Sequence, residues 1–239
     1  HIVRDRALCW RSGAGGVMQP FLIFGLTASL GATGELAGHE RRGALPFPLR
    51  SAVVGLMGAA LGIRRDGDFS ALEALEITVG LHDSGAPLRD YHTIETVPSA
   101  AAKSPNSRPE ALRDARGRTN TTITLRDYRA GPLFSVAVAG QGLEVLARAL
   151  NAPVFTLYLG RKSCPLAAPP GARLVQADGP EDALAQLILP PWRQDARLHG
   201  LIVEDPSGEV LHDRAIDRAR WHFAPRRVTL RPVASGGKA

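Results

Sequence analysis

The stretch from His82 to Gly117 most constrains how this chain of 239 residues folds. It has little apolar periodicity and contains Pro87, Pro98, Pro105 and Pro109. A structureless loop of this length is uncommon inside a compact domain, so the stretch is predicted to be a functional insertion or a partly disordered segment. The ordered elements on its two sides must therefore build one core around it.

Apolar runs of strand length and helical patterns alternate on both sides of the insertion. The predicted strands cover residues 21–26, 77–81, 119–129, 133–138 and 155–159. Residues 52–61 are apolar on every face and predict a buried helix, whereas 143–150 predict an amphipathic helix ended by Asn151. The order β-α-β, insertion, β-β-α-β is the split βαβ arrangement of a ferredoxin-like, α+β fold.

A smaller unit is predicted after Pro165. It contains a helix over 181–187 and strands over 198–204, 210–212 and 228–231, with a hairpin turn at 205–208. The predicted organisation is therefore core over 18–81 and 119–166, inserted segment over 82–118, and a small C-terminal unit over 167–239.

The first seventeen residues precede Met18 and are predicted to be an upstream segment or a cloning remnant. Cys164 is then the one cysteine of the protein proper, so no internal disulfide is expected and a reducing cytoplasm is the predicted location. The longest uncharged helical run, 51–63, is 13 residues, short of the roughly 20 that a membrane span needs. We expect no membrane partner.

The charge of the chain favours an anionic partner. The formal net charge is +6, and 26 of the 29 basic residues are Arg, which suits phosphate and base recognition. A GC-rich coding sequence gives the same Arg excess. We find no metal-ligand spacing, phosphate-loop motif or dinucleotide fingerprint, so no cofactor is expected.

The clearest functional motif is a basic turn over residues 160–164. A predicted strand stops at Gly160, and Arg161, Lys162 and Ser163 follow in consecutive positions. A forked cation, a compact cation and a hydroxyl suit a phosphate backbone. The alternative is a solvated basic loop at a strand end.

A second motif, Leu88-Arg89-Asp90-Tyr91-His92-Thr93, has acid–base character. His92 with Tyr91 or Lys103 has the side chains for metal-independent RNA cleavage. The alternative is that Tyr91 and His92 anchor the base of the insertion. Residues 125–128 repeat the Leu-Arg-Asp-Tyr string of 88–91, so the two strings are candidates for the paired legs of a hairpin.

Four strings together resemble the CasD subunit family of the type I-E CRISPR surveillance complex, Cascade, over Met18 to about Pro232. They are residues 48–65, 88–93, 158–166 and 221–228. The resemblance implies a ferredoxin-like, RNA-recognition-type core with an inserted thumb and a small C-terminal β unit. It also implies a non-catalytic subunit that binds the 5′ handle of CRISPR RNA and helps organise pairing with target DNA, beside the backbone and large subunits.

By string match the resemblance carries over nine contacts to RNA. They are Tyr158, Arg161, Lys162 and Ser163 in the basic turn, Arg50 and Ser51 at the start of the buried helix, and Arg89, Tyr91 and His92 at the root of the thumb. Ser51 is also predicted to cap that helix. The Pro-Met-x-x-Trp-Gly string of relatives is replaced here by residues 26–31. Two other interpretations stay open: an endoribonuclease that processes CRISPR repeat RNA, and a stand-alone RNA-binding module.

Overall fold

The computed structural model describes residues 18–34, 41–218, 220 and 222–233. The predicted upstream segment 1–17 and Trp221 of the fourth string lie outside the described residues. The fold is α+β, with antiparallel pairing throughout its main sheet.

The main sheet contains a ferredoxin-like set of four strands. In spatial order they are β4 (Glu76–Asp83), β7 (Leu133–Ala139), β1 (Gln19–Thr27) and β8 (Arg173–Ala177). By chain order this is 2-3-1-4, the order expected of a split βαβ repeat. β9 (Gly200–Asp217) and β10 (His222–Pro232) extend the sheet beyond β4.

Both faces of β1 are buried, which explains its continuous apolar run. Leu22 and Phe24 pack in the core beneath α1 (Arg50–Ala60) and α4 (Leu143–Asn151). Phe21 and Ile23 point to the other face, where Leu184 of α5 (Pro180–Leu184) covers them. A short helix, α2 (Ser70–Glu73), leads into β4.

The strand predicted over 155–159 is wrong. This segment joins no sheet, because the N–H groups of Val154 and Phe155 bond to the last carbonyls of α1, those of Ala60 (3.0 Å) and Ala59 (3.2 Å). The fourth core strand is β8, whose pairing with β1 leaves it at the edge of the sheet. An edge strand with alternate exposed positions carries a weaker apolar signal than a central one.

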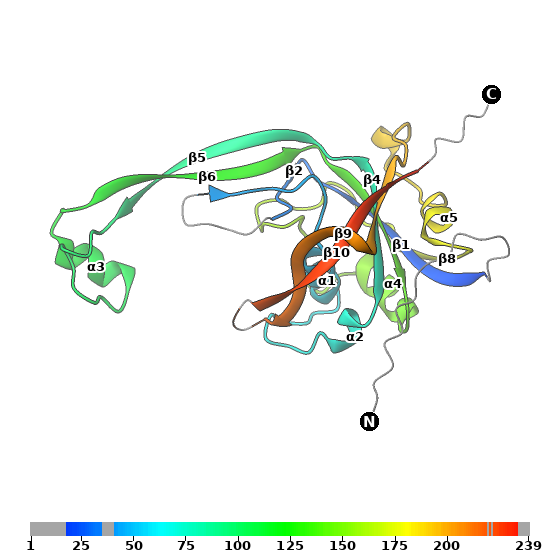
Figure 1. Ribbon diagram of the computed structural model, residues 1–239, viewed down its shortest axis with the longest axis horizontal. Coiled ribbons are helices and arrows are strands. Elements are labelled where there is room, and N and C mark those ends of the chain that lie inside the picture. The colour runs from blue at the N-terminus through cyan, green and yellow to red at the C-terminus, as the bar shows by residue number, and fades with distance from the viewer. Residues whose placement is uncertain (1–17, 35–40, 219, 221, 234–239) are drawn as a thin grey trace.

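The insertion is an ordered hairpin that projects from one side of the core (Figure 1). We call residues 86–130 the projecting hairpin. Its legs are β5 (Ala86–Thr96) and β6 (Asn120–Ala130), and α3 (Arg108–Ala115) lies at its tip. The two Leu-Arg-Asp-Tyr strings do pair, with Arg89 opposite Asp127. The second leg therefore comes from the segment that the sequence assigned to the core.

Two very short strands strengthen the root of the projecting hairpin. β2 (Leu30–Gly31) and β3 (Arg41–Arg42) both pair with β6 on the side away from β5. At the tip, Ser107 caps α3 by accepting a hydrogen bond from the N–H of Glu110, and Ala111 and Ala115 are buried. A two-stranded ribbon is marginal on its own in water, so these contacts help to order it.

The C-terminal residues are continuous with the core sheet because β9 pairs with β4, and they do not form a separate unit. The turn predicted at 205–208 is also wrong. Glu204 and Val210 lie opposite the consecutive residues Val228 and Arg227, so residues 205–209 bulge out of β9. The chain reverses after Asp217 instead, where β9 ends.

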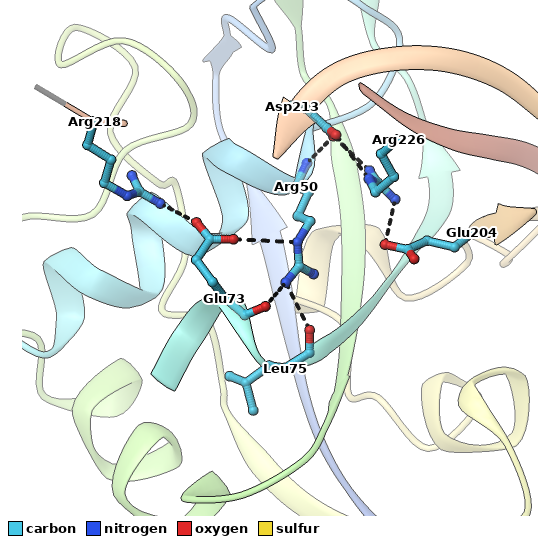
Figure 2. Close-up of polar contacts among 7 residues, drawn as sticks. All are labelled: Arg50, Glu73, Leu75, Glu204, Asp213, Arg218 and Arg226. Carbon is cyan, nitrogen blue, oxygen red and sulfur yellow. Dashed lines mark hydrogen bonds and ion pairs between the residues drawn. The ribbon is translucent and has the colours of Figure 1, made fainter. Parts of the chain in front are cut away.

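A buried carboxylate attaches β9 to the start of α1 (Figure 2). Asp213 Oδ2 accepts the backbone N–H of Arg50 at 2.8 Å, and the same carboxylate binds the Arg226 guanidinium at 2.9 and 2.7 Å. The helix N-cap is Leu49, with no side-chain cap bond, so the prediction that Ser51 caps it is wrong. A negative charge at this end of a helix is favourable, and here a distant strand supplies it.

The Arg50 side chain lies in the same charge network (Figure 2). Its Nη2 donates to the carbonyls of Glu73 (2.8 Å) and Leu75 (3.0 Å), at the end of α2. The Glu73 carboxylate lies 3.7 Å from Arg50 Nε and accepts from Arg218 at 2.7 Å. Burial lowers the pKa of Arg50, and the Glu73 charge opposes that shift.

We expect Asp213→Ala to destabilise the fold by about 3–5 kcal/mol, because it uncaps α1 and leaves the buried Arg226 guanidinium with the more distant Glu204 carboxylate, at 3.6 Å, as its partner. Urea unfolding followed by circular dichroism measures the change. Glu209→Ala, at an exposed position of the same strand, is the matched control and is expected to stay within about 0.5 kcal/mol. Equal stability of the two variants would contradict the capping role.

Candidate nucleic-acid interface

The basic turn is a tight loop closed by its own backbone. The N–H of Leu159 donates to the Cys164 carbonyl at 2.8 Å, and the N–H of Cys164 donates to the Arg161 carbonyl at 2.8 Å. Gly160 has φ +87°, and a Cβ there would lie 1.8 Å from the carbonyl oxygen of Ala32. Glycine is thus required by contact with the protein backbone.

The side chains of the turn differ in their exposure to solvent. Lys162 and Ser163 are exposed, Arg161 is half-buried, and Cys164 is buried, so the thiol is not offered to a ligand. Tyr158, which forms an isolated bridge with Pro165 at the neck of the turn, is 37% exposed. Its ring is therefore accessible to a stacking partner.

Arg161 joins the turn to the root of the projecting hairpin. Its guanidinium carbon lies 4.5 Å from the centroid of the Tyr128 ring on β6, within cation–π range. Its Nη2 donates to the carbonyl of Arg42 on β3 at 3.3 Å. Its Nη1 finds no hydrogen-bond partner among the described residues. The Tyr128 ring and the Arg42 carbonyl thus hold the guanidinium in place, and the Nη1 atom without a partner is buried, not exposed to a ligand.

A second charged cluster lies across the hairpin root. The Asp127 carboxylate binds Arg89 at 2.7 and 3.2 Å and Arg41 at 3.2 and 3.0 Å. The hydrogen bond from Arg89 is the main cause that lowers the pKa of Asp127 to about 2, and the bond from Arg41 adds to it. The carboxylate stays ionised and holds two exposed arginines in fixed positions.

The predicted site residues divide between the two faces of the projecting hairpin. Side chains alternate along a strand, and cross-strand partners share a face. Arg89 and Tyr91 share the face of Asp127, and Tyr91 is 67% exposed. His92 lies on the other face, with Tyr128 and hence Arg161, and its Nε2 contacts the Asp90 carboxylate.

The structure also gathers cations that the sequence analysis did not select. They are Arg41 and Arg42 on β3, and Arg126 and Arg129 on β6. Arg126 could have been selected from the sequence, because it lies in the second Leu-Arg-Asp-Tyr string. Arg41 and Arg42 could not, because no local sequence pattern predicts that β3 pairs with β6. The root of the projecting hairpin is therefore more basic than the turn alone.

Two of the predicted contacts lie at the start of α1. Arg50 is 3% exposed and its guanidinium is bound to carbonyls of the protein, so this arrangement does not support its predicted role as an RNA contact. Its backbone N–H already binds the Asp213 carboxylate, which takes the place that a phosphate would need. Ser51 is half-buried in the first turn of the same helix.

Within the described ranges, no helix is long and apolar enough to cross a membrane. The same residues contain no cluster of three or more His, Cys, Asp or Glu side chains that could hold a metal ion.

The depressed pKa of Asp127 predicts a pH-dependent contribution to stability. A carboxylate whose pKa falls from 3.8 to about 2 on folding stabilises the fold above pH 4 and loses that contribution as the pH falls toward 2. Both arginines are largely exposed, so we expect less than about 1 kcal/mol. Urea unfolding of wild type and Asp127→Asn between pH 6 and pH 3 measures it. A difference that grows as the pH falls would contradict this sign.

Three comparisons relate this chain to known proteins. A family described as CRISPR-associated protein (Cas_Cas5) matches residues 21–229. The CRISPR system Cascade subunit CasD of Escherichia coli (strain K12) is 36% identical over 186 residues, which are 70% of this chain and 76% of that protein.

Two solved structures are similar over most of the chain. One is titled CRISPR RNA-guided surveillance complex, with a TM-score of 0.65, 26% identity and 89% of each chain covered. The other is titled Crystal structure of Cas protein, with a TM-score of 0.57 and 26% identity, covering 89% of this chain and 94% of the other.

Proposed function

Because this chain belongs to the Cas5 family of CRISPR-associated proteins, we propose that it is a subunit of a Cascade-type complex that binds the 5′ handle of CRISPR RNA in antiviral defence. The E. coli relative is named as a Cascade subunit, and one structural neighbour is part of an RNA-guided surveillance complex. The partners that follow are CRISPR RNA, the backbone and large subunits and, through the complex, target DNA.

The observation that carries the proposal is the placement of Arg161. Tyr128 and the Arg42 carbonyl hold its guanidinium in the free protein. Binding therefore costs little further side-chain entropy at Arg161. Lys162 and Ser163 are exposed beside it and offer an ammonium and a hydroxyl to phosphate oxygens. Tyr158 is accessible at the neck of the turn for stacking on an unpaired base.

The projecting hairpin extends this surface away from the turn. Arg89, Tyr91 and His92 lie on its first leg, and Tyr91 is exposed for a base to stack on. In the proposed role the hairpin follows the guide strand and helps organise its pairing with target DNA. In this proposal the subunit binds RNA and does not catalyse a reaction.

Replacing Arg161 and Lys162 together with Ala should weaken binding to a labelled CRISPR repeat RNA by tenfold or more, because contacts to charged groups contribute about 1.5–3 kcal/mol each. Losing two phosphate contacts to single-stranded RNA should also reduce the slope of log K against log salt by about 1.4. Fluorescence anisotropy over a salt series measures both quantities.

The matched control removes two exposed arginines elsewhere, Arg148 on α4 and Arg197 before β9, by substitution with Ala. This variant has the same net charge as the Arg161/Lys162 variant, so a general loss of positive charge affects both equally. Equal weakening in the two variants, or an unchanged salt slope in the first, would count against the proposal.

A second function has one specific observation behind it. His92 Nε2 contacts the Asp90 carboxylate, and such a pair can orient an imidazole for proton transfer. This supports the alternative in which the protein cleaves CRISPR repeat RNA without a metal. Of the two predicted partners of His92, Lys103 lies beyond the end of β5 in the tip, and Tyr91 lies on the opposite face of the projecting hairpin.

Incubating the purified protein with labelled repeat RNA and EDTA separates the two functions. We expect intact RNA in the presence of wild-type protein, since the proposed role is binding. Cleavage that is present in wild type and absent in His92→Ala would instead establish the endoribonuclease. Thr124→Ala, which changes the cross-strand neighbour of His92, is the control for local disturbance.

A further inference from the structure

Both legs of the projecting hairpin leave the core through a glycine with a left-handed backbone. Gly85 precedes β5 with φ +73°, and Gly131 follows β6 with φ +66°. The first hairpin pair, Ala86 and Ala130, lies immediately beyond them. A Cβ on Gly85 would come within 2.7 Å of the Ala130 carbonyl oxygen, so the two legs lie very close together here. We call this point, where both legs join the core, the pivot of the hairpin.

One side chain from outside the hairpin binds both sides of this pivot. Arg193 Nη2 donates to Asp83 Oδ2 at 2.7 Å, just before Gly85, and its Nη1 donates to the carbonyl of Gly131 at 2.9 Å. The Asp83 carboxylate also accepts the N–H of Gly85 at 2.8 Å through its other oxygen. The guanidinium fork therefore joins the entering leg to the leaving leg.

Arg193 is held rigidly enough to act in this way. It ends a short 3₁₀ helix, Pro191–Arg193, and its N–H donates to the Pro190 carbonyl at 2.8 Å. Its own carbonyl accepts the N–H of Ala196 at 3.1 Å. Two consecutive prolines limit the backbone before it. Its side chain is only 22% exposed.

The leg that leaves the hairpin has further contacts with the core, and the leg that enters it has fewer. The N–H of Gly131 donates to the Ser29 carbonyl at 2.9 Å, and Thr27 Oγ1 donates to the Pro132 carbonyl at 3.0 Å. β6, the leaving leg, also pairs with β2 and β3. Among the described strands, β5, the entering leg, pairs with β6 alone. The entering leg thus depends more strongly on the contact at Asp83.

We propose that Arg193 is a positioning residue that fixes the direction in which the projecting hairpin leaves the core. This goes beyond the proposed RNA-binding role, because it concerns the orientation of the hairpin whatever the hairpin binds. A strand of 11 residues is about 36 Å long, so a rotation of about 10° at the pivot moves the tip by about 6 Å. Loss of the Arg193 contacts therefore allows a small rotation at the pivot to become a large displacement of α3.

The test is a spin-label distance measurement on the full chain. Labels are placed at Asp114→Cys on α3 and Glu144→Cys on α4, both exposed, in a background with Cys9→Ser and Cys164→Ser. We expect Arg193→Ala to widen the distance distribution by about 6 Å or more, the displacement of a 10° rotation. The midpoint of thermal unfolding should shift by less than about 3 °C, because partly exposed ion pairs add little stability.

Further variants make the result specific. Arg193→Lys keeps the charge but lacks the fork, and Asp83→Asn keeps an acceptor for Gly85 but loses the ion pair, so both should also widen the distribution. Arg197→Ala removes the same charge from an exposed position of the same segment and should leave it unchanged. The proposal is overturned if Arg193→Ala and Asp83→Asn both keep the wild-type width, or if Arg197→Ala widens it equally.

Discussion

The antiparallel pairing of β4 with β7 is the constraint on which the rest of the structure depends. These strands are central in the sheet, and Val79 and Val136 lie opposite each other in a fully buried part of it. Their pairing places the end of one strand beside the start of the next. Whatever is inserted between them must leave and return at adjacent points, and an antiparallel hairpin satisfies this requirement directly.

Two carboxylates decide which arginines lie in the interior and which lie at the surface. Asp213 occupies the start of α1 and pairs with Arg226, so this helix end and Arg50 belong to the interior. Asp127 instead lies at the root of the projecting hairpin, where it orients Arg41 and Arg89 at the surface. The same ion-pair chemistry therefore stabilises the core in one place and prepares an exposed basic surface in the other.

The projecting hairpin can present different chemistry on its two faces because, among the described residues, no layer of structure covers most of it (Figure 1). One face carries Arg89 and the exposed Tyr91, and the other carries His92 near Tyr128 and Arg161. A ribbon of this kind depends on its root for order. The contacts of Arg161 with Tyr128, and of Arg193 with Gly131, supply that order from two different segments.

The sequence by itself determined the elements that rest on local periodicity. These include the buried first strand, the apolar helix, the strands on both sides of the insertion and the pairing of the two Leu-Arg-Asp-Tyr strings. The basic turn was also visible, since its cations are consecutive. Repeats of two and of 3.6 residues, and turn residues, can all be read within a short window.

Only the tertiary structure decided which of those residues meet. It placed the fourth core strand at β8, buried Arg50 and brought Arg161 to the root of the projecting hairpin. The contacts responsible join residues far apart in the chain: 163 positions separate Arg50 from Asp213, and 119 separate Arg42 from Arg161. A local pattern cannot specify such partners, because which side chains meet depends on how complete elements pack against one another.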